Sequence, residues 1–462
     1  MEKPVEKNKE YIVDIIDNGF EGEGIAKVNN FTIFIPGAIK GERIKILIVK
    51  VLSSHAFGKI IEILTKSEDR EKEDCYTYKR CGGCNLRHIN YTTTINIKRN
   101  IVQSLVNKTL KNKIQVRETI GMEDPYNYRN KAQYPIGLNK KGEPVIGVFA
   151  NRTHEIIPFE DCKIQKPISE KIARFICQYI KEKNISVYNE KTCKGIFRHI
   201  VIKVGIATNE IMCILVINAD GFKEEEDLVK KLKTKFTNIK TIVKNTNKRN
   251  TNVILGSKNV TLYGDGYIYD KLDEFKFKIS PMSFYQVNPI QTEKLYNLAI
   301  EKAKLTGKEV VFDLYCGIGT IGIFAAKHAR QVYGIEIVEE AIKDAKQNAK
   351  INDVENINFF AGDVEELLFD LIDNKKIKPD VIIVDPPRKG LDGKSINNIV
   401  RVLPKKVIYI SCNPATLVRD LKLLEDTYEI KEIQPVDMFP FTSHVECVAV
   451  LELKTNMSQH TI

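Results

Sequence analysis

The sequence predicts three domains: a small N-terminal β-barrel, a central α+β domain, and a C-terminal doubly wound α/β domain with a Rossmann-like sheet. Three observations favour this multidomain fold class. The chain has 462 residues, which suits about three domains of roughly 150 residues each. Its beginning alternates apolar and polar residues between glycine-rich turns, and its last third alternates strand-like and helix-like segments in a regular order.

The barrel is expected over residues 1–64. Segments such as FTIFI and ERIKILIVKVL are rich in β-branched residues, and the turn signals NG, GEG and PG separate them. Residues 65–275 mix short strands with helices, including a helix expected over residues 91–115. These patterns indicate a small all-β domain followed by an α+β domain.

The third domain is expected over residues 276–462. The segments EVVFDLY, QVYGIEI, INFFAG, DVIIVD and KVIYISC have the composition of buried strands, and helical segments lie between them. Strands of this kind that alternate with helices are typical of a parallel sheet covered on both faces. In such folds ligands bind at the carboxyl edge of the sheet, where the loops after the strands meet.

The charge balance favours a polyanionic partner such as RNA, because 71 Lys and Arg outnumber 60 Asp and Glu and give a net charge of +11. Solubility alone is the simpler interpretation of the same excess. No stretch approaches the roughly 18 apolar residues of a membrane span, and the charged first residues lack the apolar core of a signal peptide. We expect a cytoplasmic protein with no membrane partner and no obligate protein partner.

A glycine loop follows the first strand of the third domain. Gly317, Gly319 and Gly322 have the spacing G-x-G-x-x-G, which lets backbone amides approach a ligand at the start of a helix. Glu336 ends the second strand, where an acid can bind a ribose. This pattern fits a nicotinamide-dependent redox enzyme as well as an S-adenosylmethionine enzyme.

Two further carboxylates favour S-adenosylmethionine. Asp313 ends the strand before the loop, where it can attract the positive methionine moiety but would repel a pyrophosphate. Asp363 follows the third strand, where it can accept a hydrogen bond from an adenine amino group. A helix cap is the simpler interpretation of Asp363.

A candidate nucleophile follows the fifth strand. Asp385 begins the rigid loop DPPRKG after the fourth strand, and Cys412 lies in SCNP after the next one, so both belong to the same sheet edge. A thiolate that adds to C6 of uracil makes C5 nucleophilic enough to take a methyl group. A base must then remove the C5 proton, and His444 and Glu446 near the C-terminus are the candidates.

Four cysteines indicate a metal centre. Cys75, Cys81 and Cys84 are close in sequence, and Cys162 lies in a second charged segment. Four thiolates suit either zinc or an iron-sulfur cluster, and zinc is the commoner assignment for this spacing alone.

Taken together, these motifs identify the chain as similar to the RNA uracil-C5 methyltransferases, in the branch that acts on 23S ribosomal RNA and has a TRAM domain and a [4Fe-4S] cluster. The resemblance covers nearly the whole chain. The motifs that carry it are the GEG turn, CGGC, FYQVN, DLYCGIGTIG, DPPRKG, SCNPATLVRD and HVECV, in the family's order.

The resemblance implies roles for these residues. Cys412 matches the nucleophile and Glu446 the base that takes the C5 proton. It implies that the four cysteines bind the cluster, that the helix over 91–115 packs on the catalytic domain, and that the central domain binds RNA. The residues expected around S-adenosylmethionine are Gln286, Tyr315, Glu336, Asp385, Asp363, Asp313 and Gly317.

The predicted function is therefore methylation of uridine C5 in RNA, with 23S ribosomal RNA as the expected substrate. Transfer RNA is an alternative substrate for the same chemistry. A non-catalytic RNA-binding protein with a metal-stabilised domain and a nicotinamide-dependent redox enzyme are alternatives of other classes.

Overall fold

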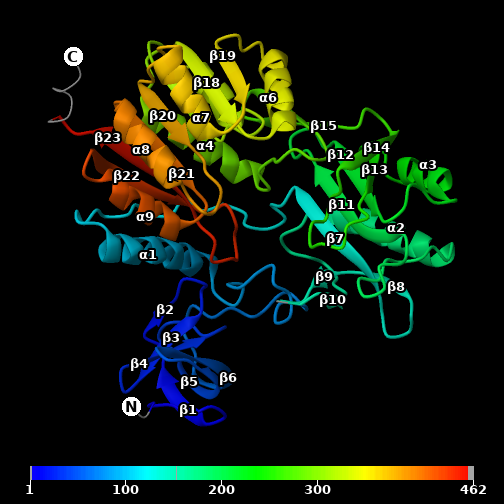
Figure 1. Cartoon of the computed structure of the whole chain (residues 1–462). Coiled ribbons are helices and arrows are strands. Elements are labelled where there is room, and N and C mark those ends of the chain that lie inside the picture. The colour runs from blue at the N-terminus through cyan, green and yellow to red at the C-terminus, as the bar shows by residue number, and fades with distance from the viewer. Residues whose placement is uncertain (1–2, 152, 456–462) are drawn as a thin grey trace.

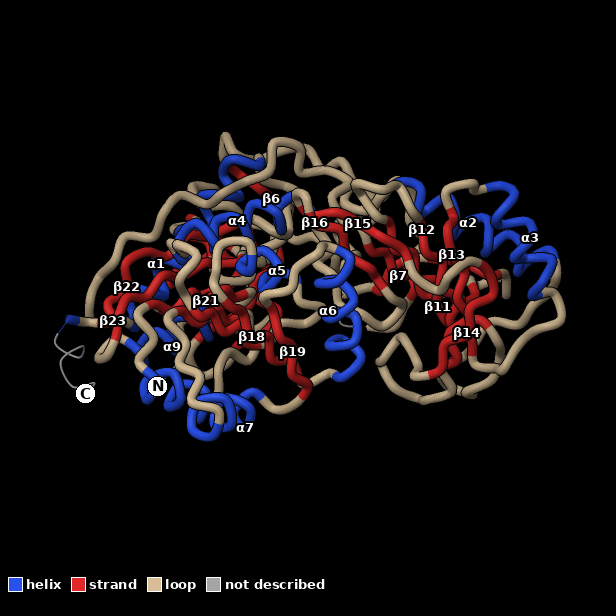
Figure 2. The backbone as a smooth tube through the Cα atoms, turned by 90° about the horizontal axis from the view of Figure 1, so that it is seen from above, coloured by secondary structure: helices blue, strands red, loops and turns tan. Residues whose placement is uncertain are grey.

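The computed structural model describes residues 3–151 and 153–455 of the chain. A small barrel at the N-terminus lies below two larger α/β bodies, which Figure 1 places at the upper left and the upper right. Seen from above, these bodies lie side by side with the hairpin β15–β16 between them (Figure 2). No helix within the described residues is long and apolar enough to cross a membrane.

The N-terminal domain is a curled six-stranded sheet in the order β1-β5-β6-β4-β3-β2. Alternate residues of β5, among them Ile44 and Ile46, point into its core, as the period of two in a strand requires. The sequence therefore predicted the small barrel correctly. Its strands are β1 (Glu10–Asp14), β2 (Asp17–Asn18), β3 (Gly24–Val28), β4 (Phe31–Ile35), β5 (Arg43–Val51) and β6 (His55–Thr65).

Helix α1 (Tyr91–Thr109) follows a loop that contains three of the cysteines. The side chain of Asn90 caps its first turn by accepting a hydrogen bond from the Thr93 amide. The helix packs against α9 (Pro414–Leu424) of the third domain. It is shorter than the expected 91–115, because Leu110 is extended and the ammonium of Lys113 donates to the carbonyls left free at the end.

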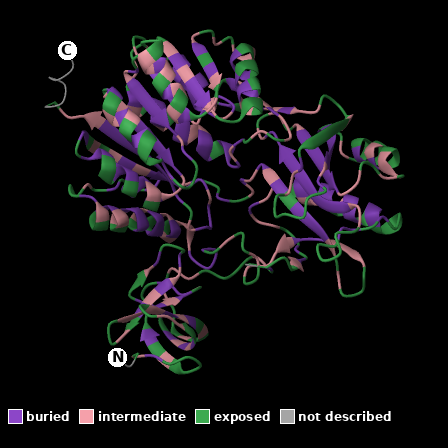
Figure 3. Cartoon of the chain, viewed as in Figure 1, coloured by how far each residue is buried: buried purple, intermediate pink, exposed green. Residues whose placement is uncertain are grey.

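The central domain has a six-stranded sheet in the order β14-β13-β12-β11-β7-β8. Strands β11 and β12 are buried along their whole length, and Figure 3 shows them inside the body. Helices α2 (Pro167–Glu182) and α3 (Glu225–Lys235) pack on the sheet. The strands here are β7 (Lys131–Leu138), β8 (Pro144–Ile146), β9 (Val148–Phe149), β10 (Ile156–Ile157), β11 (Phe197–Val204), β12 (Ile211–Ile217), β13 (Ile239–Thr246) and β14 (Lys258–Tyr263).

The third domain has a seven-stranded sheet in the order β19-β18-β17-β20-β21-β23-β22. Its first five strands are parallel, as the sequence predicts for a Rossmann-like core. They are β17 (Val310–Leu314), β18 (Gln331–Glu336), β19 (Ile357–Ala361), β20 (Val381–Val384) and β21 (Lys406–Ser411). The strand order reverses between β17 and β20, and ligands of such sheets bind at this point.

Helices and a short hairpin complete this domain. The hairpin β15 (Ile268–Leu272) and β16 (Phe275–Ile279) precedes α4 (Pro289–Ala303) and contacts it. The remaining helices are α5 (Thr320–Ala326), α6 (Glu339–Ile351), α7 (Val364–Phe369), the π-helical turn η1 (Asp370–Asn374) and α8 (Gly393–Val402).

The sheet departs from an all-parallel arrangement at one edge. Strands β22 (Tyr428–Val436) and β23 (Glu446–Leu453) form an antiparallel pair, and β23 is inserted between β21 and β22. The insertion brings the end of the chain back beside β21. The loop over residues 437–445 thereby meets the carboxyl edge of the parallel strands.

Candidate active site

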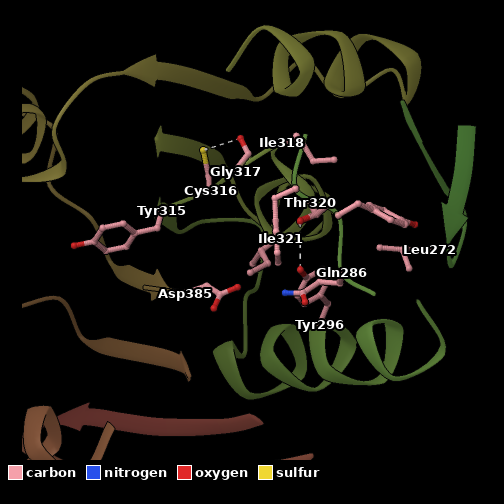
Figure 4. A pocket seen from close by; sticks show the side chains of 12 residues that line it. Leu272, Gln286, Tyr296, Tyr315, Cys316, Gly317, Ile318, Thr320, Ile321 and Asp385 are labelled. Atoms are coloured by element: carbon pink, nitrogen blue, oxygen red, sulfur yellow. Dashed lines mark hydrogen bonds between the residues drawn. The ribbon is translucent and has the colours of Figure 1, made fainter. Parts of the chain in front are cut away.

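The glycine loop after β17 forms one wall of a small pocket of about 50 Å³. Gln286, Tyr315, Gly317 and Asp385 all line it, so the structure brings these four predicted cofactor residues together. In Figure 4 the carboxylate of Asp385 and the amide of Gln286 point toward each other across the pocket. They come from segments about 100 residues apart, and the folded sheet joins them.

Two glycines of the loop have separate roles. Gly319 has φ of +80° and begins α5, and an added Cβ would lie 2.6 Å from the ring of Phe359, so only glycine fits. Gly317 has φ of +54°, but an added Cβ would meet nothing within 4 Å. Its backbone therefore faces open space in the pocket. The Gly317 amide also donates to a carboxylate oxygen of Glu336 over 3.2 Å, which places Glu336 beside the loop.

Tyr315 also occupies a left-handed conformation, with φ of +66°. Such a conformation is strained for a tyrosine, and strain of this kind concentrates at functional sites. In Figure 4 the ring of Tyr315 turns away from the other pocket side chains. Its hydroxyl lies 3.2 Å from that of Ser395 on α8.

Asp363 has the simpler of its two predicted roles in this structure. It is the N-cap of α7, and its Oδ1 atom accepts hydrogen bonds from the amides of Glu365 and Glu366. The pocket beside the glycine loop is not lined by it. A contact with adenine stays a prediction.

Asp313 is a buried carboxyl behind the glycine loop. It is fully buried, and neither carboxyl oxygen accepts a hydrogen bond of ordinary geometry from the described residues. Burial, and next the charge of Asp385, raise its pKa to about 8. Burial also raises the pKa of Asp385 to about 7. Two desolvated carboxyls and an open backbone cradle fit a cationic ligand, as the sulfonium and ammonium groups of S-adenosylmethionine require.

Cys412 lines a second and larger cavity of about 360 Å³. Asn413 and Thr416, which follow it, both donate to the carbonyl of Arg388. These bonds hold the SCNP and DPPRKG loops next to each other, and the side chain of Arg388 lines the same cavity. Arg388 lies in the DPPRKG motif, but the sequence alone indicates no role for it.

Glu446 lies opposite Cys412 because of strand register. The antiparallel ladder of β21 and β23 pairs Ser411 with Cys447 as its last pair. The next residue on each side is Cys412 and Glu446, so the thiol and the carboxyl flank the end of the ladder. Glu446 is only 4% exposed, whereas the exposed ring of His444 lines the cavity.

The charge of the carboxyl acts on the thiol, and Asp385 and Arg388 act on both groups. Burial, and next the charge of Asp385, raise the pKa of Glu446 to about 8, while Arg388 opposes the change. Burial, then Glu446 and Asp385, raise the pKa of Cys412 to about 11, again against Arg388. The charge of Asp385 therefore raises pKa values at both cavities, which lie next to each other at the sheet edge.

The cysteine-rich loop abuts this second cavity. The amides of Asn85 and Leu86 both donate to the carbonyl of Phe441, 3.0 Å away. The guanidinium of Arg87 lies 4.2 Å from the centre of the Phe441 ring. The loop over residues 437–445, which leads into Glu446, is therefore held by residues that directly follow Cys84.

The four predicted metal ligands lie near one another. Cys75, Cys81, Cys84 and Cys162 are all free thiols. Burial, opposed by Arg87, and then the charges of the three other thiols raise the pKa of Cys84 to about 12. Among residues 3–151 and 153–455, however, no group of three or more His, Cys, Asp or Glu side chains has the arrangement of a metal site. Four thiols are nevertheless the donor set of a thiolate metal centre.

The fold resembles that of a known methyltransferase. The chain superimposes on the crystal structure of Pyrococcus abyssi tRNA (uracil-54, C5)-methyltransferase in complex with S-adenosyl-L-homocysteine, with a TM-score of 0.77 and 26% identity. The match covers 96% of this chain and all of that one. The third domain is thus a methyltransferase fold with a Rossmann-like core.

Sequence comparison gives the family. Residues 90–454 match the model described as tRNA (Uracil-5-)-methyltransferase, and residues 4–61 match the TRAM domain. An uncharacterized RNA methyltransferase of Clostridium acetobutylicum is 48% identical over 458 residues, or 98% of this chain and 99% of that one. One of Staphylococcus aureus is 44% identical over 441 residues, or 95% and 97%. The chain belongs to the tRNA (uracil-5-)-methyltransferase family, carries an N-terminal TRAM domain, and is an RNA methyltransferase.

Proposed function

We propose that this protein methylates C5 of a uridine in RNA through a covalent adduct between Cys412 and C6 of the uracil. One observation carries the proposal: Cys412 and Glu446 flank the end of one strand ladder, beside the pocket that Asp385 and Gln286 line. A nucleophile and a base so placed can act on adjacent atoms of one ring. S-adenosylmethionine, held by the glycine loop and its carboxylates, supplies an electrophilic methyl group on sulfur.

The reaction has three steps, which are addition of the thiolate, methyl transfer and elimination. The thiolate sulfur of Cys412 adds to C6, and the electrons of the C5–C6 double bond move into an enolate. C5 then forms a bond to the methyl carbon while the bond between that carbon and the sulfonium sulfur breaks, and the sulfur leaves as a neutral thioether with the electron pair. Glu446 takes the C5 proton, the double bond returns, and the bond between C6 and sulfur breaks. Arg388 favours both anionic forms, because its charge lowers the pKa of Cys412 and of Glu446.

Two rival classes lack support at the site. A nicotinamide enzyme of the doubly wound type has the strand order 3-2-1-4-5-6, whereas an antiparallel strand is inserted after the fifth strand here. A non-catalytic RNA-binding protein would have no need of a thiol opposite a buried carboxyl in an open cavity.

We propose 23S ribosomal RNA as the substrate, following the resemblance of the whole motif set. The test is mass-spectrometric mapping of 5-methyluridine in ribosomal and transfer RNA from cells with and without the gene. Loss of one or two methylated positions in 23S RNA supports the proposal. Loss in transfer RNA alone would correct the substrate and leave the chemistry intact. An unchanged pattern in both would overturn the proposed function.

We further propose that Cys75, Cys81, Cys84 and Cys162 bind a [4Fe-4S] cluster, with zinc as the alternative. Protein purified without oxygen is then expected to contain about four iron and four sulfide ions per chain. Cys162→Ser should release this iron and lower the melting temperature, because Cys162 joins a distant segment to the cysteine-rich loop.

The matched control is Cys193→Ser, which changes an exposed thiol of the same domain and should leave the iron content unchanged. Stoichiometric zinc without iron in the wild type would replace the cluster by the alternative. Normal iron in Cys162→Ser would show that the fourth ligand is elsewhere.

A further inference from the structure

One wall of the Cys412 cavity comes from the TRAM domain. Phe20 and Glu21 line the cavity together with Arg388, Cys412 and His444. Both residues belong to the turn between β2 and β3, which lie at the end of the barrel nearest α1 in Figure 1. The barrel therefore reaches the candidate active site, although nearly 400 residues separate Phe20 from the thiol.

The turn is held firmly in this position. The side-chain amide of Asn85 donates to the carbonyl of Glu21 and to the hydroxyl of Ser443, and its oxygen accepts from the Ser443 amide over 2.8 Å. Gly22 has φ of +83°, and an added Cβ would lie 2.4 Å from Leu86. Hydrogen bonds therefore connect three segments at this place: the turn between β2 and β3, the cysteine-rich loop, and the loop over residues 437–445.

Phe20 is an exposed large hydrophobic residue that lies outside the buried core of the barrel. Half of its surface is exposed, and it makes no ring contact with another described residue. Its neighbours around the cavity are mostly polar, among them Arg388 and Asn413. A large apolar ring exposed beside polar groups is a common feature of surfaces that bind another molecule.

We propose that Phe20 stacks on a nucleobase that flanks the target uridine. The inference rests on the proposed function. Proteins that recognise unpaired RNA stack its bases on aromatic side chains. The thiol and the methyl group must both approach the target uracil through its ring faces, so these faces are not free for stacking. The base that stacks on Phe20 is therefore a neighbour of the target. Arg388 in the same cavity can offset the phosphate charge.

The kinetic test compares Phe20→Ala with the wild type on the RNA that the wild type methylates. We expect KM for RNA to rise about tenfold, as loss of one stacked base implies, with kcat at saturating RNA within about twofold of wild type. The affinity for S-adenosylmethionine should be unchanged, since Phe20 does not line that pocket. Phe20→Tyr should restore the wild-type KM.

Ile12→Ala is the matched control. Ile12 is an exposed apolar residue on β1 of the same barrel and does not line the cavity, so its loss should leave KM unchanged. Equal melting temperatures for both variants would exclude a folding defect in the barrel.

A direct test uses RNA with 5-iodouridine next to the target position, irradiated with Cys412→Ser protein. The expected crosslink lies in the peptide that contains Phe20. If wild-type protein methylates the RNA but Phe20→Ala has the wild-type KM and the crosslink maps elsewhere, the inference is wrong and the proposed function stands. If wild-type protein methylates no uridine, the proposed function itself fails.

Discussion

Replacement of Cys412 by alanine is expected to abolish methylation, with turnover reduced on the order of 10⁴-fold or more, because no adduct can then make C5 nucleophilic. The thiol has the access that this role needs, since it is partly exposed in the cavity. The raised pKa of Cys412 favours the protonated thiol in the free protein. The thiolate is therefore a minor form until a positively charged group binds nearby.

Two measurements separate loss of chemistry from loss of structure. Calorimetry should give Cys412→Ala the wild-type affinity for S-adenosylmethionine, because Cys412 does not line the cofactor pocket. RNA containing 5-fluorouridine should form a covalent complex with the wild type only, since fluorine at C5 cannot leave as a proton. Cys193→Ala should behave as wild type. Methylation by Cys412→Ala would disprove the covalent mechanism.

The sequence predicted the layers of the fold because their signals are local. The β-branched alternation around Ile44 fixes which side of a strand faces the barrel core, and the loop Gly317–Gly322 marks the first strand and helix of the Rossmann-like core. The end of α1 was misplaced by about six residues, since Lys113 caps the helix from outside it. No periodicity in the sequence specifies such a contact.

The candidate site was predictable only in part. The motifs placed Asp385 and Cys412 at the same sheet edge, and the hydrogen bonds to the Arg388 carbonyl confirm that their loops adjoin. The position of Glu446 opposite Cys412 depends on the register of an inserted antiparallel strand. The approach of Phe20 depends on how one domain docks on another. Neither arrangement has a local signal in the sequence.

Protonation of Glu446 bears on the release of the product. A carboxyl whose pKa is raised is neutral at pH values below that pKa, so Glu446 becomes a competent base only as pH rises through about 8. We expect wild-type kcat to increase between pH 7 and pH 9 if release limits turnover. The ionisation of Cys412, with its higher pKa, adds to the same direction of change.

Glu446→Gln is expected to separate the role of the carboxylate from that of the thiolate. Adduct formation and methyl transfer need the thiolate but not the carboxylate. At pH values where Glu446 is charged, its replacement by glutamine lowers the pKa of Cys412, so the adduct should form at least as readily as in the wild type. The C5 proton then has no base, and a methylated protein–RNA complex should accumulate while turnover falls on the order of 10²–10⁴-fold. Denaturing electrophoresis with a labelled methyl donor detects this complex.

Glu452→Gln provides the matched control, since Glu452 is a carboxylate on the same strand that pairs instead with Lys406 over 3.5 Å. It should neither accumulate the complex nor lose activity. His444→Gln tests the other candidate base, whose pKa is lowered by partial desolvation at the cavity wall and then by the charge of Arg388. If the His444 variant traps the adduct and the Glu446 variant turns over normally, the base is His444. If only Glu446→Gln traps the adduct, Glu446 is the base that removes the C5 proton. Release of the Cys412 thiol depends on this proton removal, so the buried carboxyl opposite Cys412 then completes the reaction.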